Sequence, residues 1–258
     1  MSSFFRELFS TGRGDGGASG SIDESHFIVP PLVGPSPHGL WEAFMRGRVS
    51  ELSQLAEDLD SQFGPDSGVQ EAPLPISAIS LRPLTYDDQE TWSALRERNA
   101  DWLSPWDAGN PLSGQDDGRT PGLTYNAWIG NIRKSEEEGR GTIFGVYRDD
   151  DLIGQLSLGA INYGALRTGT IGYWISHQQA GHGYIPQAVA ILADWAFKDP
   201  QGPRLHRLEI NVLPENARSI RVAEKLGFTR EGLRRGYMYV NGQWRDHLSY
   251  SLLTSDLS

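Results

Sequence analysis

The stretch from residue 171 to residue 198 constrains the fold most, because strand spacing changes there to helix spacing across a glycine loop. Alternating apolar residues, typical of a strand, come first, at Ile171, Tyr173 and Ile175. Apolar residues at helical spacing come last, at Ala188, Ile191, Leu192, Trp195 and Ala196. Gly181 and Gly183 in the loop allow a tight turn and a close approach of the backbone to a ligand. Because the free N–H groups of a helix start bind anions, the stretch predicts a phosphate cradle.

A glycine pair alone is a weak signal, since any strand-to-helix turn can use one. The run Gln-x-x-Gly-x-Gly at 178–183 resembles the acyl-CoA pyrophosphate loop of the GNAT N-acyltransferases. The preceding Gly-Tyr-Trp-Ile at 172–175 is similar to the RimJ/RimL group of that family, which acetylates protein N-termini. That group often has a basic residue where this chain has Ala180. The cradle is therefore expected to rely on backbone N–H groups rather than on an added charge.

Further motifs extend the resemblance over residues 76–255, about 70% of the 258 residues. Ile-x-Leu-Arg-Pro-Leu at 79–84, Asn-x-x-Ser-x₅-Lys-x-Gly-Phe at 216–228 and Asn-Gly-x-Trp-Arg-Asp-His at 241–247 each resemble a RimJ/RimL segment, of the ribosomal-protein-alanine N-acetyltransferase type. The resemblance implies an α/β (α+β mixed-sheet) GNAT acyl-CoA N-acyltransferase fold. In that fold a twisted mixed sheet is flanked by helices, and two parallel strands, here 168–175 and 205–213, splay apart at the cofactor site. Acetyl-CoA is the implied cosubstrate.

The remaining pattern predicts the order β-α-α-β-β-β-α-β-α-β-β. Thr85 is expected to cap a helix that ends near residue 98, and the aromatic stretch 102–106 is either core packing or a wall of the acceptor site. Three consecutive Asp at 149–151 are read as a solvated turn rather than a metal site. The other expected elements are strands over 79–84, 142–148, 152–160, 229–240 and 243–253, and helices over 124–138 and 216–227.

The N-terminal residues 1–75 are predicted to form an extension to a GNAT acetyltransferase domain over 76–258. Residues 10–39 have Gly/Ser/Pro composition, which predicts no regular structure. Residues 40–62 have the pattern of an amphipathic helix, which either packs on the domain or binds a partner. Residues 1–75 hold 4 Arg and 11 Asp and Glu, a sum of −7, and residues 76–258 hold 19 Lys and Arg and 22 Asp and Glu, a sum of −3.

The net charge of −10 makes direct nucleic-acid binding a poor expectation and favours attraction of a basic peptide. The absence of cysteine excludes disulfides, thiolate–metal sites and a cysteine nucleophile, so any acyl transfer is expected to be direct. No metal is expected. No apolar run is long enough to span a membrane and no signal peptide is recognisable, so a cytoplasmic protein without membrane contact is expected, as a monomer or homodimer.

Direct transfer needs a base for the acceptor amine, a hydrogen-bond donor for the thioester oxygen and a proton for the leaving thiolate. By resemblance to RimL-like enzymes, Ser219 is the expected acid, although a serine in a first helical turn also bonds locally. Glu209 and Asn211 share one strand face and are candidate catalytic residues, with Glu209 two residues further from Asn216 than the family pattern. The residues expected to bind the cofactor are Ile175, Ala180, Gly181, His182, Gly183, Tyr184, Asn216 and Ser219.

Tyrosines are alternative proton carriers or simple core aromatics, namely Tyr173, Tyr237, Tyr239 and Tyr250. His206 and His247 show no metal-ligand spacing. The expected function is acetyl transfer to a protein N-terminal amine of the alanine or serine type found on ribosomal proteins. Two alternatives stay open: acetylation of a small amine such as a polyamine, amino sugar or drug, and a non-catalytic acyl-CoA-binding module.

Overall fold

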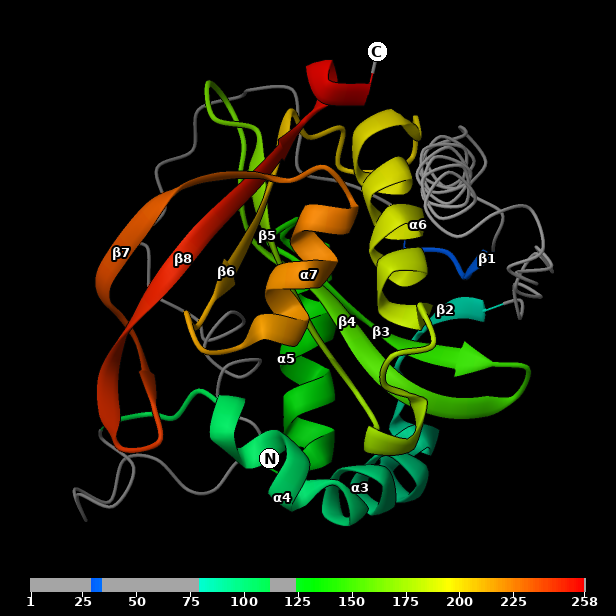
Figure 1. The fold of residues 1–258 in the computed structure, drawn as a ribbon. Helices are drawn as coiled ribbons and strands as arrows, with labels where there is room; N and C mark the ends of the chain where they lie inside the picture. The colour runs from blue at the N-terminus through cyan, green and yellow to red at the C-terminus, as the bar shows by residue number, and fades with distance from the viewer. Residues whose placement is uncertain (1–28, 34–78, 112–123, 258) are drawn as a thin grey trace, which may run out of the picture.

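The computed structural model describes residues 29–33, 79–111 and 124–257. Within these, one eight-stranded mixed sheet has the order β1-β2-β3-β4-β5-β6-β8-β7 (Figure 1). The strands are β1 (Leu32–Val33), β2 (Ile79–Pro83), β3 (Thr142–Arg148), β4 (Asp151–Asn162), β5 (Thr168–Ile175), β6 (Arg207–Val212), β7 (Thr229–Val240) and β8 (Gln243–Leu253). The predicted helix over 40–62 lies outside the described residues, and so does most of 10–39.

The described helices are α3 (Gln89–Arg98), α4 (Ala100–Leu103), α5 (Tyr125–Glu137), α6 (Tyr184–Lys198) and α7 (Ala217–Lys225). Short 3₁₀ turns precede or follow some of them, at η1 (Tyr86–Asp88), η2 (Ser104–Trp106), η3 (His177–Gln179) and η4 (Thr254–Leu257). The first helix begins as predicted after Thr85, where the Asp88 carboxylate accepts from the Thr85 N–H at 2.7 Å and from its hydroxyl at 2.9 Å. Thr124 caps α5 by accepting from the Ala127 N–H at 3.2 Å.

The predicted element order is confirmed, with small differences in bounds. β6 is shorter than the predicted 205–213, because the Leu205 N–H donates to the α6 carbonyl of Ala196 at 2.8 Å instead of joining the sheet. β4 starts at Asp151, so the turn before it is made by the first two of the three aspartates. The β7–β8 hairpin turns at Asn241 and Gly242, whose φ angles of 51° and 78° suit the tight turn that this pair predicts.

The expectation of no regular structure over 10–39 is wrong at Leu32–Val33. Leu32 pairs with Leu81 and Val33 with Ser80, which makes β1 an antiparallel edge strand. Prolines are tolerated at the start of an edge strand, so Pro30 and Pro31 do not prevent it. Leu32 is buried in the main core cluster. The boundary at residue 76 stays a prediction, but part of the predicted extension belongs to the sheet.

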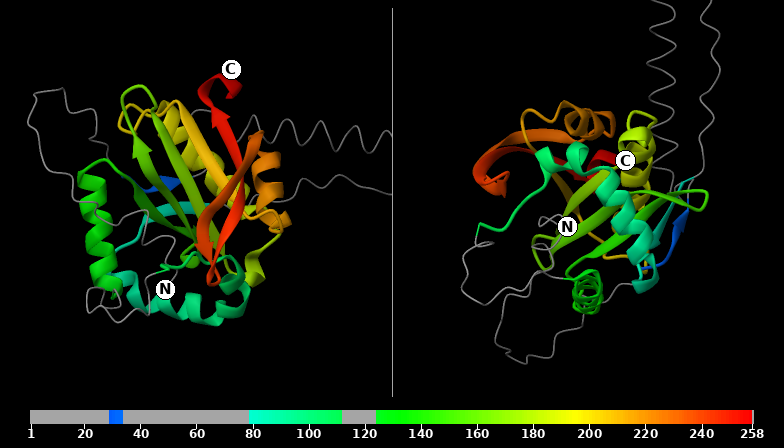
Figure 2. Two further views of the ribbon diagram at one scale, coloured as in Figure 1. Left: turned by 90° about the vertical axis from the view of Figure 1, so that its left-hand side faces the viewer. Right: turned by 90° about the horizontal axis from the view of Figure 1, so that it is seen from below.

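Two apolar cores cover the two faces of the sheet. One contains most of α6, including Trp195, together with Phe144 and Leu158. The other contains Trp92 of α3 and Trp128 of α5. Figure 2 shows α5 and α7 on opposite sides of the sheet. Because α6 is buried almost all round, its N-terminus is held in a fixed position beside the end of β5.

The strands β5 and β6 form the one parallel pair of the described sheet, and they separate along their length. They are paired only from Thr168 with Arg207 to Ile171 with Ile210. Beyond this point β5 pairs with β4 alone, up to Gly154 with Ile175, and β6 pairs with β8 alone. The splayed parallel strands that the sequence predicts are therefore present, with a gap between their C-terminal halves.

Candidate active site

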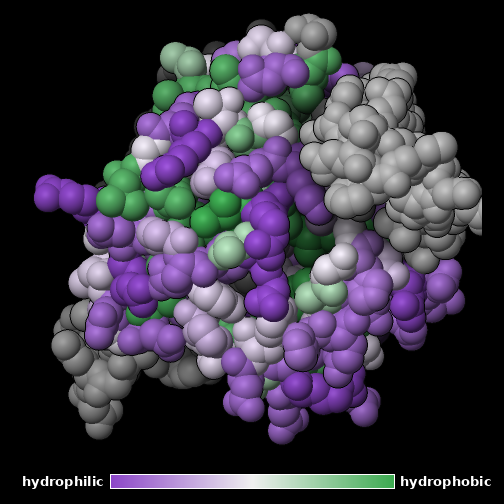
Figure 3. All heavy atoms as spheres, viewed as in Figure 1, coloured by the Kyte–Doolittle hydropathy of each residue, from purple (hydrophilic) through white to green (hydrophobic). Residues whose placement is uncertain are grey.

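A cavity of about 500 Å³ opens where β5 and β6 separate. Its walls come from the second halves of both strands, the loop before α6, one face of α7, the α4–η2 segment and the β7–β8 hairpin. On the side that carries α6 and α7 the surface is mostly hydrophilic, and apolar side chains are visible in recesses between the polar ones (Figure 3). The size suits an extended small molecule that reaches between two strands.

The glycine loop forms one end of the cavity. Gly181 and Gly183 line it and have φ angles of 86° and 81°, a left-handed conformation that favours glycine. The first N–H groups of α6, at Tyr184 and Ile185, have no partner within the helix. Pro186 follows and has no N–H to leave unpaired. This end can therefore hold an anion by backbone N–H groups and by the positive end of the helix.

Three of the predicted cofactor-binding residues differ from one another in their place at the cavity. Ala180 lines the cavity, but its N–H donates to the His177 carbonyl at 3.2 Å within the η3 turn, so it is not a free donor. Ile175 lines the cavity, but its carbonyl accepts from the Trp102 indole N–H at 3.0 Å. His182 is exposed, stacks on the Tyr184 ring at 5.8 Å and is not part of the cavity wall. The available cradle therefore begins at Gly181.

Position 180 carries no basic side chain in this protein, and the basic side chains of the cavity wall come from α7. Arg218, Arg221 and Lys225 lie three and four positions apart, so they share one helix face, and all three line the cavity. The Arg218 guanidinium lies over the Trp102 ring, 4.9 Å from its centroid. The positive charge beside the loop thus comes from another element.

The start of α7 places Asn216 and Ser219 in the cavity wall. The Asn216 side chain accepts from the Ser219 N–H at 3.1 Å, which is the capping role that its sequence position predicts. The Tyr173 hydroxyl donates to the Ser219 carbonyl at 3.3 Å, and burial raises the pKa of Tyr173. Both backbone groups of Ser219 are therefore held, and its side chain projects from a fixed helical turn.

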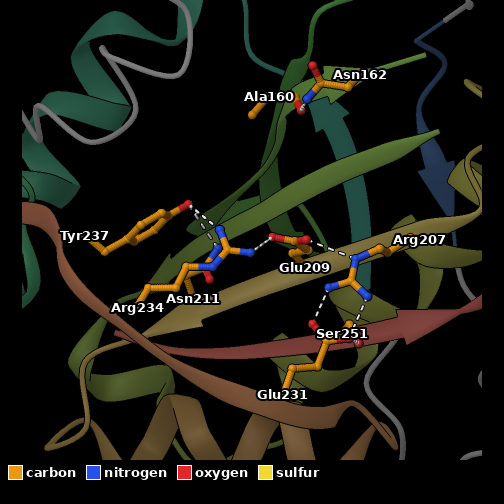
Figure 4. A network of polar contacts seen from close by, with 9 residues as sticks. All are labelled: Ala160, Asn162, Arg207, Glu209, Asn211, Glu231, Arg234, Tyr237 and Ser251. Carbon is orange, nitrogen blue, oxygen red and sulfur yellow. Dashed lines mark hydrogen bonds and ion pairs between the residues drawn. The ribbon is translucent and has the colours of Figure 1, made fainter. Parts of the chain in front are cut away.

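The two candidate catalytic residues on β6, Glu209 and Asn211, lie in different surroundings. Asn211 lines the cavity and its amide donates to the Tyr237 hydroxyl at 3.4 Å. Glu209 does not line the cavity. Its carboxylate lies between Arg207 at 3.0 Å and Arg234 at 2.7 Å (Figure 4). Because the two guanidinium groups already engage both carboxylate oxygens, this arrangement does not support Glu209 as a catalytic base.

The opposite end of the cavity is largely aromatic and apolar. Trp106 lines it, which fits the acceptor-wall alternative for that part of the 102–106 stretch, and Met238 and Val240 come from β7. Trp102 lies nearer the glycine loop, where its ring contacts His177 at 4.5 Å. Asp107 is the one carboxylate among the described lining residues, and it pairs with Arg96 at 2.5 Å. This end therefore offers an acceptor a mainly apolar surface.

Comparisons with known proteins agree with this geometry. The family model described as Acetyltransferase (GNAT) domain matches residues 79–229. The probable N-acetyltransferase YjcK of Bacillus subtilis is 34% identical over 184 residues, which cover 69% of this chain and 95% of that protein. The chain belongs to the GNAT acetyltransferase family.

Two further relatives of this GNAT protein carry more specific names. The [ribosomal protein uS5]-alanine N-acetyltransferase of Escherichia coli is 26% identical over 198 residues, covering 75% of this chain and 97% of that one. The solved structure of Mycobacterium smegmatis RimJ in complex with CoA-disulfide has a TM-score of 0.63 and 34% identity, and covers 70% of this chain and 84% of that one. The expected fold and the N-acetyltransferase class are thereby confirmed.

Three further features of the described residues concern possible metal binding and membrane spanning. Among the described residues no group of three or more His, Asp or Glu could hold a metal ion. Of the Asp149–Asp151 turn, Asp150 pairs with Arg82 at 3.1 Å. Of the helices the structure describes, none has the length and apolar character required to cross a bilayer.

Five residues that line the cavity were not expected there from the sequence: Arg218, Arg221, His177, Met238 and His247. His177 adjoins the glycine loop and the two arginines adjoin Ser219, whereas Met238 and His247 come from the β7–β8 hairpin. Tyr250 is buried in the core and Tyr239 contacts Trp244 edge to face at 5.8 Å, and neither tyrosine is in the cavity wall. No local pattern marks Met238 and His247 as wall residues, because their position at the cavity depends on which strands pair.

Proposed function

We propose that this chain transfers the acetyl group of acetyl-CoA directly to the α-amino group of a protein N-terminus, of the alanine or serine type found on ribosomal proteins. The observation that carries the choice of acceptor is the wall of the acceptor end. A polyamine carries several positive charges, which free carboxylates would hold, whereas a peptide N-terminus carries one and brings neutral backbone with it. The described acceptor end offers one carboxylate, Asp107, already paired with Arg96 at 2.5 Å, and otherwise Trp106, Met238, Asn211 and His247.

The residues present fit acetyl-CoA. The loop from Gly181 to Tyr184 supplies backbone N–H groups for the pyrophosphate, and Arg218, Arg221 and Lys225 supply charge for the phosphates. The gap between β5 and β6 leaves strand edges unpaired for an extended pantetheine arm. The RimJ relative was solved in complex with CoA-disulfide, which supports the same assignment here.

Ser219 is proposed to donate a proton to the departing sulfur. Its backbone is held by Asn216 and by Tyr173, so the side chain projects from a fixed helical turn. Asn211 is proposed to orient the acceptor through its side-chain amide, which already bonds to Tyr237. In the transfer, the amine nitrogen bonds to the carbonyl carbon, the C–S bond breaks with its electron pair on sulfur, and the thiolate takes a proton.

The test is release of the coenzyme A thiol from acetyl-CoA with a panel of acceptors. The panel contains peptides that begin with Ala or Ser, the same peptides with blocked N-termini, a peptide whose only amine is a lysine side chain, and spermidine and glucosamine. Turnover of the free N-terminal peptides and loss of turnover on blocking is the expected result. Turnover of the small amines alone would exclude the peptide acceptor, and tight acetyl-CoA binding without turnover of any amine would indicate a non-catalytic binding module.

A further inference from the structure

His247 is a buried histidine in the wall of the cavity, and nothing above gives it a task. It lies on β8 and is 4% exposed. It lines the acceptor end together with Asn211 and Met238. Strand pairing brings it there, because β8 is hydrogen-bonded to β6 through the pairs Asn211 with Ser249 and Val212 with Leu248.

The hydrogen bond of the ring determines its tautomer. His247 Nδ1 lies 3.1 Å from the carbonyl oxygen of Arg245. A carbonyl only accepts, so Nδ1 must carry the hydrogen. The neutral ring then has its lone pair on Nε2. The Tyr237 ring contacts the imidazole edge to face at 5.6 Å, which limits rotation of the ring.

We propose that His247 is the general base that removes a proton from the attacking amine, an inference that rests on the proposed function for its substrate. Nε2 accepts a proton from the nitrogen as the N–C bond forms. The acceptor ammonium loses its first proton to solvent before attack, and this second proton passes to Nε2. The sulfur takes the proton of Ser219, and Ser219 regains a proton from solvent as His247 releases its own, so one proton is released in each turnover. Each bond that breaks therefore has a partner for its electrons and its proton.

The surroundings of His247 keep the ring available as a base. Burial lowers the pKa of His247, so the ring is neutral at neutral pH. Charged and titratable groups around it come from β7, β8 and the loop before α7, namely Arg234, Tyr237, Arg245, Asp246 and Glu215. Arg245 pairs with Glu215, and the two charges act on the pKa of His247 in opposite directions.

Glu209 is the competing base on the same side of the sheet. It is engaged by Arg207 and Arg234 and lies outside the cavity wall, whereas His247 lies within it. A base has to reach the proton it removes, within hydrogen-bond distance or through one water. The position in the cavity therefore favours His247.

The kinetic test compares His247→Gln with His206→Gln, a matched control at an exposed histidine bonded to Thr254 at 3.2 Å and outside the cavity wall. We expect kcat/KM for the amine to fall about 10²–10⁴-fold in His247→Gln, with acetyl-CoA affinity by calorimetry unchanged. The fall of kcat/KM towards acidic pH should be shallower in the variant. Added imidazole should restore part of the activity of His247→Ala. Activity equal to that of the control, or a loss with an unchanged pH profile and no imidazole rescue, would overturn the proposal.

A second readout needs neither a variant nor turnover. The long-range ¹H–¹⁵N NMR spectrum of the wild-type protein at pH 7 should show His247 neutral, with hydrogen on Nδ1. A protonated ring or hydrogen on Nε2 would overturn the proposal, even if His247→Gln fails to fold. The kinetic comparison uses whichever amine the wild-type protein acetylates. Failure of the peptide acceptor is thus seen in the wild type, and failure of the base is seen in the variants.

Discussion

The two ends of the cavity are built in different ways. The phosphate end is made mainly of backbone from one continuous stretch, residues 172–185, where a strand, two glycines and a helix start follow one another. The catalytic end is made of side chains from separate elements, with Trp106 on η2, Asn211 on β6, Ser219 on α7 and His247 on β8. Backbone donors do not depend on the side chain attached to them, whereas side-chain chemistry depends on the pairing of distant strands.

The largest expected effect lies at the catalytic end, in Ser219→Ala. Loss of an acid that protonates the sulfur should lower kcat by about 10²–10⁴-fold, or roughly 3–5 kcal/mol of barrier. Acetyl-CoA affinity should be nearly unchanged, because Asn216 caps the Ser219 backbone N–H and not its hydroxyl. The measurements are kcat, calorimetric affinity and melting temperature. Ser93→Ala, exposed on α3, is the control. A normal kcat with about 1 kcal/mol lost in stability would leave Ser219 only a local structural role.

The next effect tests the phosphate end, through Gly181→Val. A side chain there should displace the pyrophosphate from N–H groups, each worth about 1.5–3 kcal/mol to a charged acceptor. Acetyl-CoA affinity should therefore fall about 10–100-fold. Within the protein an added Cβ meets nothing within 4 Å, so the protein itself is strained only through the φ of 86°.

Gly164→Val is a matched control for that experiment. Gly164 has a φ of 63° and equally open space around a Cβ, but it lies away from the cavity. The two variants should lose similar stability, and only Gly181→Val should lose acetyl-CoA affinity. Equal affinity in both, measured by calorimetry, would place the phosphates elsewhere.

The contrast between the two ends also explains which features could be predicted from the sequence. The cradle, the capped α7 and the hairpin are local, and each is specified by residues a few positions apart, such as Asn216 with Ser219 or Asn241 with Gly242. Within the cradle, the η3 turn takes the N–H of Ala180, and the glycine pattern does not indicate this turn. The arrangement of the fold followed from the motif order and the family resemblance.

Contacts between elements that are distant in the sequence could not be predicted from local sequence patterns. His247 meets Asn211 only because β8 inserts between β6 and β7, and spacing along the chain does not specify that order. Glu209 and Asn211 do share a strand face, but alternation did not show that two arginines from other positions would hold the carboxylate. The short β1 was missed because Leu32 and Val33 carry little pattern of their own and gain their place by pairing with β2.

Glu209→Gln tests whether the Glu209 carboxylate, beside the catalytic end, is structural rather than catalytic. If the carboxylate mainly joins Arg207 to Arg234, its loss should lower the free energy of unfolding by about 1–3 kcal/mol, because two partly buried guanidinium groups lose a partner. The value of kcat should change by less than about tenfold, which is smaller than the loss of about 10²–10⁴-fold expected when a general base is removed. Urea unfolding and kcat measured on one preparation test this, with Glu97→Gln, exposed on α3, as the control. A kcat loss of about 10²-fold or more, with normal stability, would return Glu209 to the mechanism.

The smallest effect concerns Glu231, which extends the same network away from the cavity. Arg207 donates to it at 2.7 Å and Ser251 donates at 2.9 Å, and the Arg207 hydrogen bonds hold the pKa of Glu231 at about 2, below its ordinary value of 4.5. Because the pKa is lowered on folding, the contribution of Glu231 to stability is present above about pH 4.5 and is lost as pH falls towards 2. Its side chain is 42% exposed, so salt should weaken the effect. Urea midpoints at pH 5 and pH 3 should therefore differ less in Glu231→Gln than in the wild type, with kcat unchanged. An equal acid dependence in both proteins would mean that other carboxylates carry it and that the network beyond Glu209 adds little.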